Sequence, residues 1–408
     1  MDADISRDSF DPRLDFLRVI SQQGRPVLDS ETNEQTSILL HYLRTLAMDL
    51  IGPAGGPVNY CGFQITPEGP GKPTKSSKKS SPPTLWVGPG RYYVDGLICE
   101  NHRPFPLHER IQIPNAAGFH LVYLDVWEQF CCVEDMPVIA EPALEGVSTT
   151  ARSRVEWRIL IAPCEENFGP DQWDAFVNDR HPPSKIRLRV RPSLGEHESS
   201  SLGAGEIYTG DSQVYHVELQ SKDTFKWARD NASNVFGLIH REKNRVILKD
   251  VGHDHATGLA NNDIVEIVDP HSGQPGSLHV IQQIVPAEGT FTLNPPAAVW
   301  PKNSYLRRWD HPGNAQSPSL ELKEREWIDL EYGLSIWFEG ADERQPGDYW
   351  LIAARPATGS SLWTKRDAEE GREPDGVHHH YAPLATVSIG ATPTIKSHIR
   401  HFSPLAIP

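Results

Sequence analysis

Hydrophobic and polar positions alternate with a helical period in one long stretch near the N-terminus. Leucines recur at positions 39, 43, 46 and 50, and spacings of three and four residues place such side chains on one face of an α-helix. We therefore predict an amphipathic helix at about 31–51, with its leucine stripe buried against a sheet. This helix would organise the first domain of the chain.

Both ends of this helix carry recognisable signals. Asp29, Ser30 and Thr32 are candidate N-caps, and Thr32 with Gln35 has the spacing of a capping box. At the other end Gly52 precedes Pro53; glycine allows the left-handed cap and proline cannot continue a helix. The sequence therefore predicts a sharp stop at residue 52.

After the helix, most of the chain shows the short apolar runs and turn residues that are typical of β-strands. The stretch 84–100 predicts a hairpin with turns at 88–90 and 95–96. The other expected strands lie at about 119–130, 155–163, 213–219, 223–229, 234–240, 245–251, 263–269, 277–285, 289–294, 326–338, 347–355 and 383–390. We predict a mainly β protein with a minor α component.

Stretches rich in Gly, Pro and Ser divide this pattern into several parts. Turn residues recur every 8 to 12 positions in the middle of the chain, a spacing typical of a small sandwich or barrel. The predicted parts are an extended N-terminal arm (1–22), a domain of helix and β-strands (23–165, with a mobile loop at about 67–83), a linker with a short helix (166–205), a small β-barrel or sandwich (206–310), a C-terminal β domain (321–390) and an extended tail (391–408).

Composition and charge narrow the function classes. The 31 glycines and 35 prolines among 408 residues fit short strands and many turns. The net charge of −15 argues against nucleic-acid binding, because phosphate binding depends largely on basic residues. The basic run of Lys72, Lys75, Lys78 and Lys79 lies in a Ser- and Pro-rich stretch and is interpreted as a solvated loop.

Cysteine usage and hydropathy indicate a compartment. The five cysteines, Cys61, Cys99, Cys131, Cys132 and Cys164, are odd in number and form no C-x-x-C, so we expect reduced thiols and no disulfide. No apolar run approaches the roughly 18 residues of a membrane span, and the acidic N-terminus does not resemble a signal peptide. We predict a cytoplasmic protein without direct membrane insertion.

Histidines and carboxylates are the only candidates for chemistry. His253 with His255, or the triplet at 378–380, could contribute zinc ligands if another ligand came from elsewhere; the alternative is that both groups are turn residues. Glu134, Asp135 and Glu141 could include a glycosidase pair, but their spacing does not single one out. We expect no catalytic, cofactor-binding or metal-binding residues and no cofactor.

The two ends of the chain are better candidates for interaction. Both carry apolar side chains outside any predicted domain, and such exposure is typical of binding surfaces. The N-terminal arm could dock on its own domain or on a neighbour. Burial on a neighbouring subunit would order both ends in a complex, while they would remain mobile in the free protein. The predicted assembly residues are Phe10, Leu14, Phe16, Ile395, Ile399, Phe402 and Leu405.

Several phrases, in order, resemble a domain family of unassigned function that occurs in bacterial gene clusters for phage tails and contractile injection systems. The phrases are QGRPVLDSETNEQ (23–35), GRYYVDGLICE (90–100), LVYLDVWEQFCCVEDMPVIAEPALEG (121–146), TTARSRVEWRILI (149–161), FKWARDNAS (225–233), LRRWD (306–310), GDYWLIAARPATG (347–359) and GVHHHYAPLATV (376–387). The resemblance implies a tail, baseplate or fibre-associated protein, and it supplies no catalytic residues.

Together these observations predict a non-enzymatic structural component of a phage-tail-like contractile particle, at the baseplate periphery, a fibre attachment or the cap. The expected partners are other subunits of the particle, including further copies of this chain. The alternatives are a hydrolase of envelope glycans and an effector carried as cargo by the particle.

Overall fold

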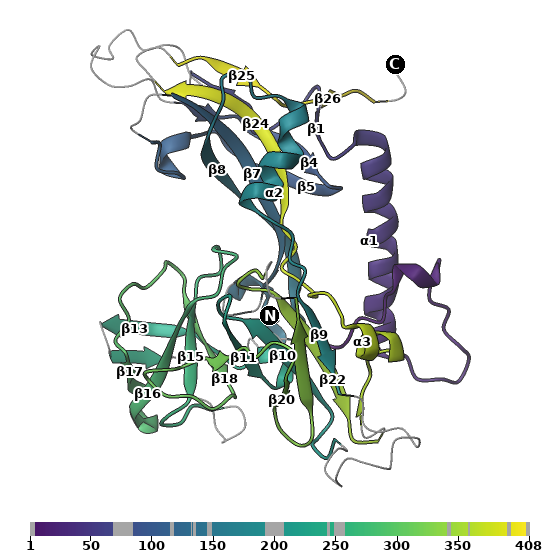
Figure 1. Ribbon diagram of the computed structural model, residues 1–408, viewed down its shortest axis with the longest axis vertical. Helices are drawn as coiled ribbons and strands as arrows, with labels where there is room; N and C mark the ends of the chain where they lie inside the picture. The colour runs from purple at the N-terminus through teal and green to yellow at the C-terminus, as the bar shows by residue number, and fades with distance from the viewer. Residues whose placement is uncertain are drawn as a thin grey trace. The chain divides into compact units, whose positions relative to one another are not determined.

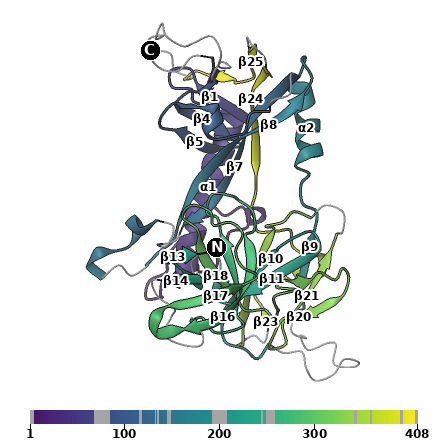
Figure 2. The ribbon, with the colours of Figure 1, turned by 90° about the vertical axis from the view of Figure 1, so that its left-hand side faces the viewer.

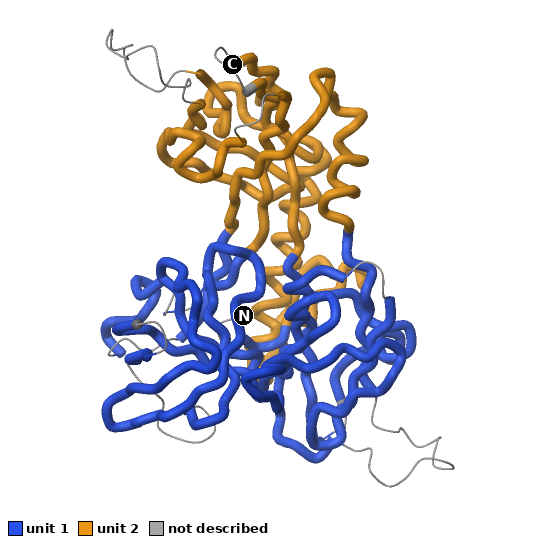
Figure 3. The backbone as a smooth tube through the Cα atoms, turned by 60° about the vertical axis from the view of Figure 1, so that its left-hand side comes forward, with its two compact units in different colours: residues 1–7, 129–154, 183–377 blue, residues 8–128, 155–182, 378–408 orange. Residues whose placement is uncertain are grey.

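The computed structural model describes residues 5–67, 85–114, 118–131, 133, 136–144, 149–191, 208–242, 245–248, 258–340, 344–357, 360–389 and 393–404. The fold is mainly β, with one long helix near the N-terminus and several small sheets, as the sequence predicts. The chain forms two compact units (Figure 3). Unit 1 comprises residues 1–7, 129–154 and 183–377, and unit 2 comprises residues 8–128, 155–182 and 378–408.

These units differ from the predicted chain-order domains. Residues 206–310 and 321–377 belong to one unit, and the last 31 residues return to the N-terminal part of the chain. The reason is strand pairing, because β24 (His380–Ile389) runs antiparallel along β7 (Gly118–Cys131), where Tyr381 lies opposite Asp125 (Figures 1 and 2). Within the predicted linker, α2 (Trp173–Arg180) lies where the sequence predicts a short helix, and β9 (Arg187–Val190) is a strand that was not predicted.

Unit 2 builds its core between three small sheets. Their apolar faces share one buried cluster, which includes Phe63, Tyr92, Leu124 and Leu384. The strand orders are β26 (His401–Phe402), β1 (Ala54–Pro57), β4 (Gly90–Val94), β5 (Leu97–Asn101); β2 (Ile65–Thr66), β3 (Trp86–Val87), β6 (Phe105–Pro106); and β25 (Ile395–Ser397), β24, β7, β8 (Arg152–Cys164).

Unit 1 contains two β bodies. The first combines the sheet β19 (Leu320–Glu321), β11 (Thr224–Ala228), β10 (Gln213–Leu219), β22 (Tyr349–Arg355), β23 (Ser360–Ser361) with the sheet β20 (Trp327–Asp329), β21 (Ser335–Glu339), β9 around one core. The second is the sheet β12 (Val235–Phe236), β18 (Tyr305–Trp309), β15 (Ile264–Val268), β16 (Ser277–Val285), β17 (Thr290–Asn294), β14 (Arg245–Leu248), β13 (Leu238–Glu242). A short helix, α3 (Lys365–Glu370), completes the unit.

Helix α1 (Asp29–Ile51) begins two residues before the predicted start. The Leu28 backbone N–H donates to the Glu31 carboxylate at 3.1 Å, so Glu31 supplies the cap in place of the predicted Thr32 and Gln35. The predicted stop is confirmed, because Gly52 has a φ of 85° and its N–H donates to the Met48 carbonyl oxygen at 2.8 Å.

The prediction that the leucine stripe of α1 is buried is wrong. The exposed fractions of Leu39, Leu43, Leu46 and Leu50 are 55%, 63%, 55% and 58%, whereas Ile38 is fully buried. The sheets of unit 2 fill their core with their own side chains. This core cluster includes no side chain of α1, and the four leucines lie in solvent.

The β4–β5 hairpin holds α1 through a glycine. Its two-residue turn has positive φ at both Asp95 (45°) and Gly96 (79°), the geometry of the predicted tight hairpin. A Cβ atom at Gly96 would lie 2.7 Å from the Arg44 carbonyl oxygen of α1. Next to this contact the Arg44 guanidinium pairs with the Glu128 carboxylate at 2.8 Å.

The C-terminal segment belongs to unit 2 over residues 393–404. Strand β25 pairs with β24, and β26 pairs in parallel with β1. Ile395 and Ile399 pack against the core, and the Phe402 ring lies 5.7 Å from that of Tyr93. The expectation of a tail outside any domain is therefore wrong for these residues, because the edges of two sheets bind them.

Candidate functional site

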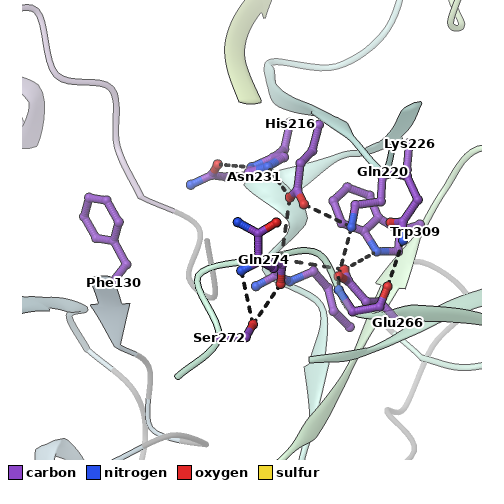
Figure 4. A network of polar contacts seen from close by, with 12 residues as sticks. Phe130, His216, Gln220, Lys226, Asn231, Glu266, Ser272, Gln274 and Trp309 are labelled. Carbon is purple, nitrogen blue, oxygen red and sulfur yellow. Dashed lines mark hydrogen bonds and ion pairs between the residues drawn. The ribbon is translucent and has the colours of Figure 1, made fainter. Parts of the chain in front are cut away.

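A buried charged network lies between the two β bodies of unit 1 (Figure 4). The Lys226 ammonium of β11 lies 3.0 Å from a Glu218 carboxylate oxygen of β10 and 2.9 Å from one of Glu266 in β15. The Trp309 indole N–H donates to Glu266 at 2.9 Å, and the ammonium lies 4.5 Å from the Trp309 ring centre.

Burial and pairing set the charges of this network. Burial lowers the pKa of His216 to about 4, so this histidine is neutral at pH 7 although it contacts Glu218 at 3.2 Å. Burial alone would raise the pKa of Glu218, but Lys226 and His216 outweigh it and lower that pKa to about 2. Burial lowers the pKa of Arg307 to about 10, so this arginine stays charged. The carboxylates of Glu218 and Glu266 are therefore balanced by the cations of Lys226 and Arg307.

Perturbed pKa values often mark catalytic sites. In this network, however, the charged side chains are too deeply buried for a substrate to reach them. Lys226 is fully buried, Glu266 is 2% exposed and Glu218 is 7% exposed. The Glu266–Lys226 pair joins strands of two different sheets, whereas Glu218 and Lys226 lie on neighbouring strands of one sheet. We therefore interpret this network as the polar contact that positions the two β bodies of unit 1, rather than as an active site.

A second polar cluster connects three strands of unit 2. The Asp125 carboxylate of β7 contacts the His379 imidazole at 2.6 Å and accepts from the Arg158 guanidinium of β8 at 2.8 Å. Nearby, the His181 and Tyr381 rings stack at 4.2 Å. Asp125 is fully buried, and its oxygens have partners on β8 and next to β24, so this carboxylate links strands of the sheet.

Two histidines of the triplet at 378–380 bind different carboxylates. His379 pairs with Asp125, while His380 pairs with a different carboxylate, that of Asp95, at 2.9 Å. Within the described ranges no three His, Cys, Asp or Glu side chains are placed to hold a metal ion. His253 and His255 lie outside these ranges.

The candidate glycosidase carboxylates receive no support. Glu134 and Asp135 lie outside the described residues. The Glu141 carboxylate is exposed and accepts the Ala143 backbone N–H at 2.9 Å, so it caps a turn. The cysteines Cys61, Cys99, Cys131 and Cys164 are free thiols, and Cys132 lies outside the described residues.

The N-terminal arm lies along α1. The Phe10 ring lies 5.4 Å from the His41 ring, and the Val19 N–H donates to the Gln35 side chain at 2.9 Å. Leu14 and Phe16 are 53% and 52% exposed. Of the other predicted assembly residues, Ile395, Ile399 and Phe402 contact unit 2, and Leu405 lies outside the described residues.

The exposed face of α1 is the most unusual surface in the described part of the chain. Thr32, Thr36 and the four leucines of the stripe are all exposed and recur at alternating spacings of four and three residues. Leu40 and Tyr42 flank them and are 38% and 49% exposed. Burying the exposed half of each leucine would contribute on the order of 1 kcal/mol. A helix this apolar on its outer face is typical of an interaction site.

No helix in the described part of the chain has both the length and the apolar character that a membrane crossing needs. A family model described as "Family of unknown function (DUF6519)" matches residues 1–166 and 210–393, which is most of the chain. No curated protein and no solved structure matches.

Proposed function

The chain belongs to this family of unknown function, and we propose that it is a non-enzymatic structural component of a phage-tail-like contractile particle, acting through protein–protein assembly. The observation that carries the proposal is the exposed apolar face of α1, whose four leucines are each more than half exposed. Such a face is stable in water when a partner covers it.

Two further features support assembly over catalysis. The two buried clusters of titratable groups have their charges paired internally, between Lys226 and two glutamates in one case and between Asp125, Arg158 and His379 in the other. The ordered phrases that resemble proteins of phage-tail and contractile injection gene clusters point to the same class. The proposed places in the particle are the baseplate periphery, a fibre attachment or the cap.

The test is to isolate the full chain, with a small affinity tag, from cells that carry its gene cluster. We expect the chain to sediment with a large particle and to appear there at a fixed ratio to the other subunits in quantitative mass spectrometry. Recovery only as a small species would contradict the proposal. Release of the chain from the tube lumen on contraction would instead indicate cargo, and solubilisation of purified envelope glycan would indicate a hydrolase.

A further inference from the structure

We infer that α1 pairs with α1 of a second copy of this chain, in antiparallel orientation, through the face that contains Leu39, Leu43, Leu46 and Leu50. This inference deepens the proposed function, on which its place in a particle rests, because it names the partner of the exposed face. The dimer itself can be tested on the isolated chain.

The spacing of the leucines is self-complementary. Positions separated by four, three and four residues form the seam of a two-stranded coiled coil, in which apolar side chains repeat every 3.5 residues. In an antiparallel pair with a two-fold axis between residues 44 and 45, Leu39 lies opposite Leu50 of the partner subunit. Leu43 then lies opposite Leu46 of the partner subunit. Every leucine meets a leucine, as a two-fold symmetric interface requires.

The contacts of α1 within unit 2 do not involve its leucine stripe. Arg44 is paired with Glu128, and the arm contacts His41 and Gln35. Ile38, which is fully buried, is also not part of the stripe. Among the described residues the leucine seam therefore stays exposed, so the pairing needs no rearrangement of the fold.

Charge favours a second copy in antiparallel orientation. The seam positions carry only Thr and Leu, so they offer no charged group for an oppositely charged partner. The first six residues of α1 include the acids Asp29, Glu31 and Glu34 and no base. Parallel pairing would place these acids of both copies side by side, where like charges repel. Antiparallel pairing separates them by about the length of the helix, roughly 34 Å.

The size of the seam sets the strength of the pair. Residues 39–50 span about 16 Å of helix, which is short compared with a standard protein interface of about 800 Å² per partner. Burial of eight half-exposed leucines must also offset the loss of rotational and translational freedom. We therefore expect a weak dimer of the isolated chain, with a Kd between about micromolar and about millimolar, that becomes strong when a particle holds many copies together.

The first test is sedimentation velocity of the full chain from about 1 μM to about 1 mM, a range that covers the expected Kd. The wild-type chain should pass from monomer to dimer across this range. Leu43→Glu and Leu46→Glu should each weaken the dimer by at least about tenfold while the circular dichroism spectrum and Tm stay unchanged, because both side chains are exposed. The matched control Thr45→Glu adds the same charge at an exposed position off the seam and should dimerise normally.

The second test fixes the orientation by oxidative cross-linking. A mixture of Leu39→Cys and Leu50→Cys chains should form a disulfide-linked dimer faster than either variant alone, with the wild-type chain as control for its native thiols. Faster linking within each variant alone would show a parallel pair and overturn the inference. So would a monomer at all concentrations, or a dimer that Thr45→Glu disrupts as much as Leu43→Glu.

The proposed function and the α1 dimer can be contradicted by different results. A dimer through α1 that never sediments with a particle would contradict the proposed function and leave this inference standing. A chain found in particles but monomeric in isolation, with Leu43→Glu incorporated normally, would contradict the inference and leave the proposed function standing.

Discussion

At the scale of single residues, Lys226 lies where water does not reach and where two carboxylates meet its charge. Such a network tolerates no loss of one member, because the remaining charges stay buried without compensation. The network also joins strands β10 and β11 to β15, so its integrity determines how the two β bodies of unit 1 pack.

We predict that Lys226→Met destabilises unit 1 by about 3–5 kcal/mol, because it removes one of the two buried cations that balance Glu218 and Glu266 and leaves Arg307 alone to do so. Urea unfolding followed by tryptophan fluorescence measures the loss. Lys222→Met is the matched control, since Lys222 is exposed, and its effect should stay within about 0.5 kcal/mol. A loss below about 1 kcal/mol for Lys226→Met would show that the network is not a structural contact.

A second residue-scale prediction concerns acid. Burial lowers the pKa of His216 and of His311 to about 4, so between their ordinary pKa of 6.5 and about 4 the unfolded chain binds more protons than the folded chain. The free energy of unfolding should therefore fall as pH falls through this window, by on the order of 1 kcal/mol per pH unit for each histidine. Glu218, whose folded pKa is about 2, extends the loss from about pH 4.5 down to about pH 2. Urea midpoints that stay constant from pH 7 to pH 4 would contradict the predicted histidine states.

Sequence reasoning did not identify either polar cluster. For the network of Lys226, the sequence contains a signal: Lys226 and Glu266 are charged residues inside the predicted strands 223–229 and 263–269. A charged residue within an apolar strand indicates a buried partner of opposite charge. Which carboxylate meets which cation depends on strands 40 residues apart, and a single sequence does not reveal that pairing. The residues in the triplet at 378–380 were noticed, but their carboxylate partners, Asp125 and Asp95, come from the other end of the chain.

At the scale of elements, period and turn chemistry predicted the strands well. β10 and β16 coincide with the predicted 213–219 and 277–285, and the hairpin turn falls at Asp95–Gly96 as expected. The prediction for α1 was right in its existence and wrong in its buried face. An apolar stripe specifies that a face will be covered, but it does not specify whether the same chain or another covers it.

The hairpin contact on α1 gives an element-scale prediction. Gly96→Ala should lower the stability of unit 2 by more than about 1 kcal/mol, because the residue has a φ of 79° and its Cβ would lie 2.7 Å from the Arg44 carbonyl oxygen. Gly24→Ala is the control, since Gly24 has a φ of 73° but no atom within 4 Å of its Cβ. Hydrogen exchange of the α1 amides should rise in Gly96→Ala and stay unchanged in Gly24→Ala. Equal effects of both substitutions would show that the close approach is unimportant.

The C-terminal strands give a second element-scale prediction. Because β25 and β26 pair with β24 and β1, deleting residues 393–408 should lower the Tm of unit 2 and expose the β24 amides to exchange. This replaces the sequence-based expectation that residues 391–408 form an extended tail that is mobile in the free protein. An unchanged Tm after deletion would favour the original expectation.

At the scale of the whole molecule, strands from the C-terminal end of the chain pair with strands from the N-terminal part, and the order of elements along the sequence does not indicate this pairing. The last strands complete the sheets of the N-terminal part, and residues 183–377 form most of unit 1 between them. Composition and turn spacing predicted the mainly β, multidomain class, because those properties depend on local sequence. The grouping into units depends on the pairing of β7 with β24 across more than 250 residues, which local patterns do not encode.

The central claim is that the exposed leucine face of α1 acts in assembly. The most direct measurement is the amount of chain recovered in purified particles from cells that produce the wild-type protein, Leu46→Glu or Thr45→Glu at equal levels, normalised to another particle subunit. We predict normal recovery for the wild type and for Thr45→Glu, and at least about a tenfold loss for Leu46→Glu. Equal recovery of all three would contradict the account.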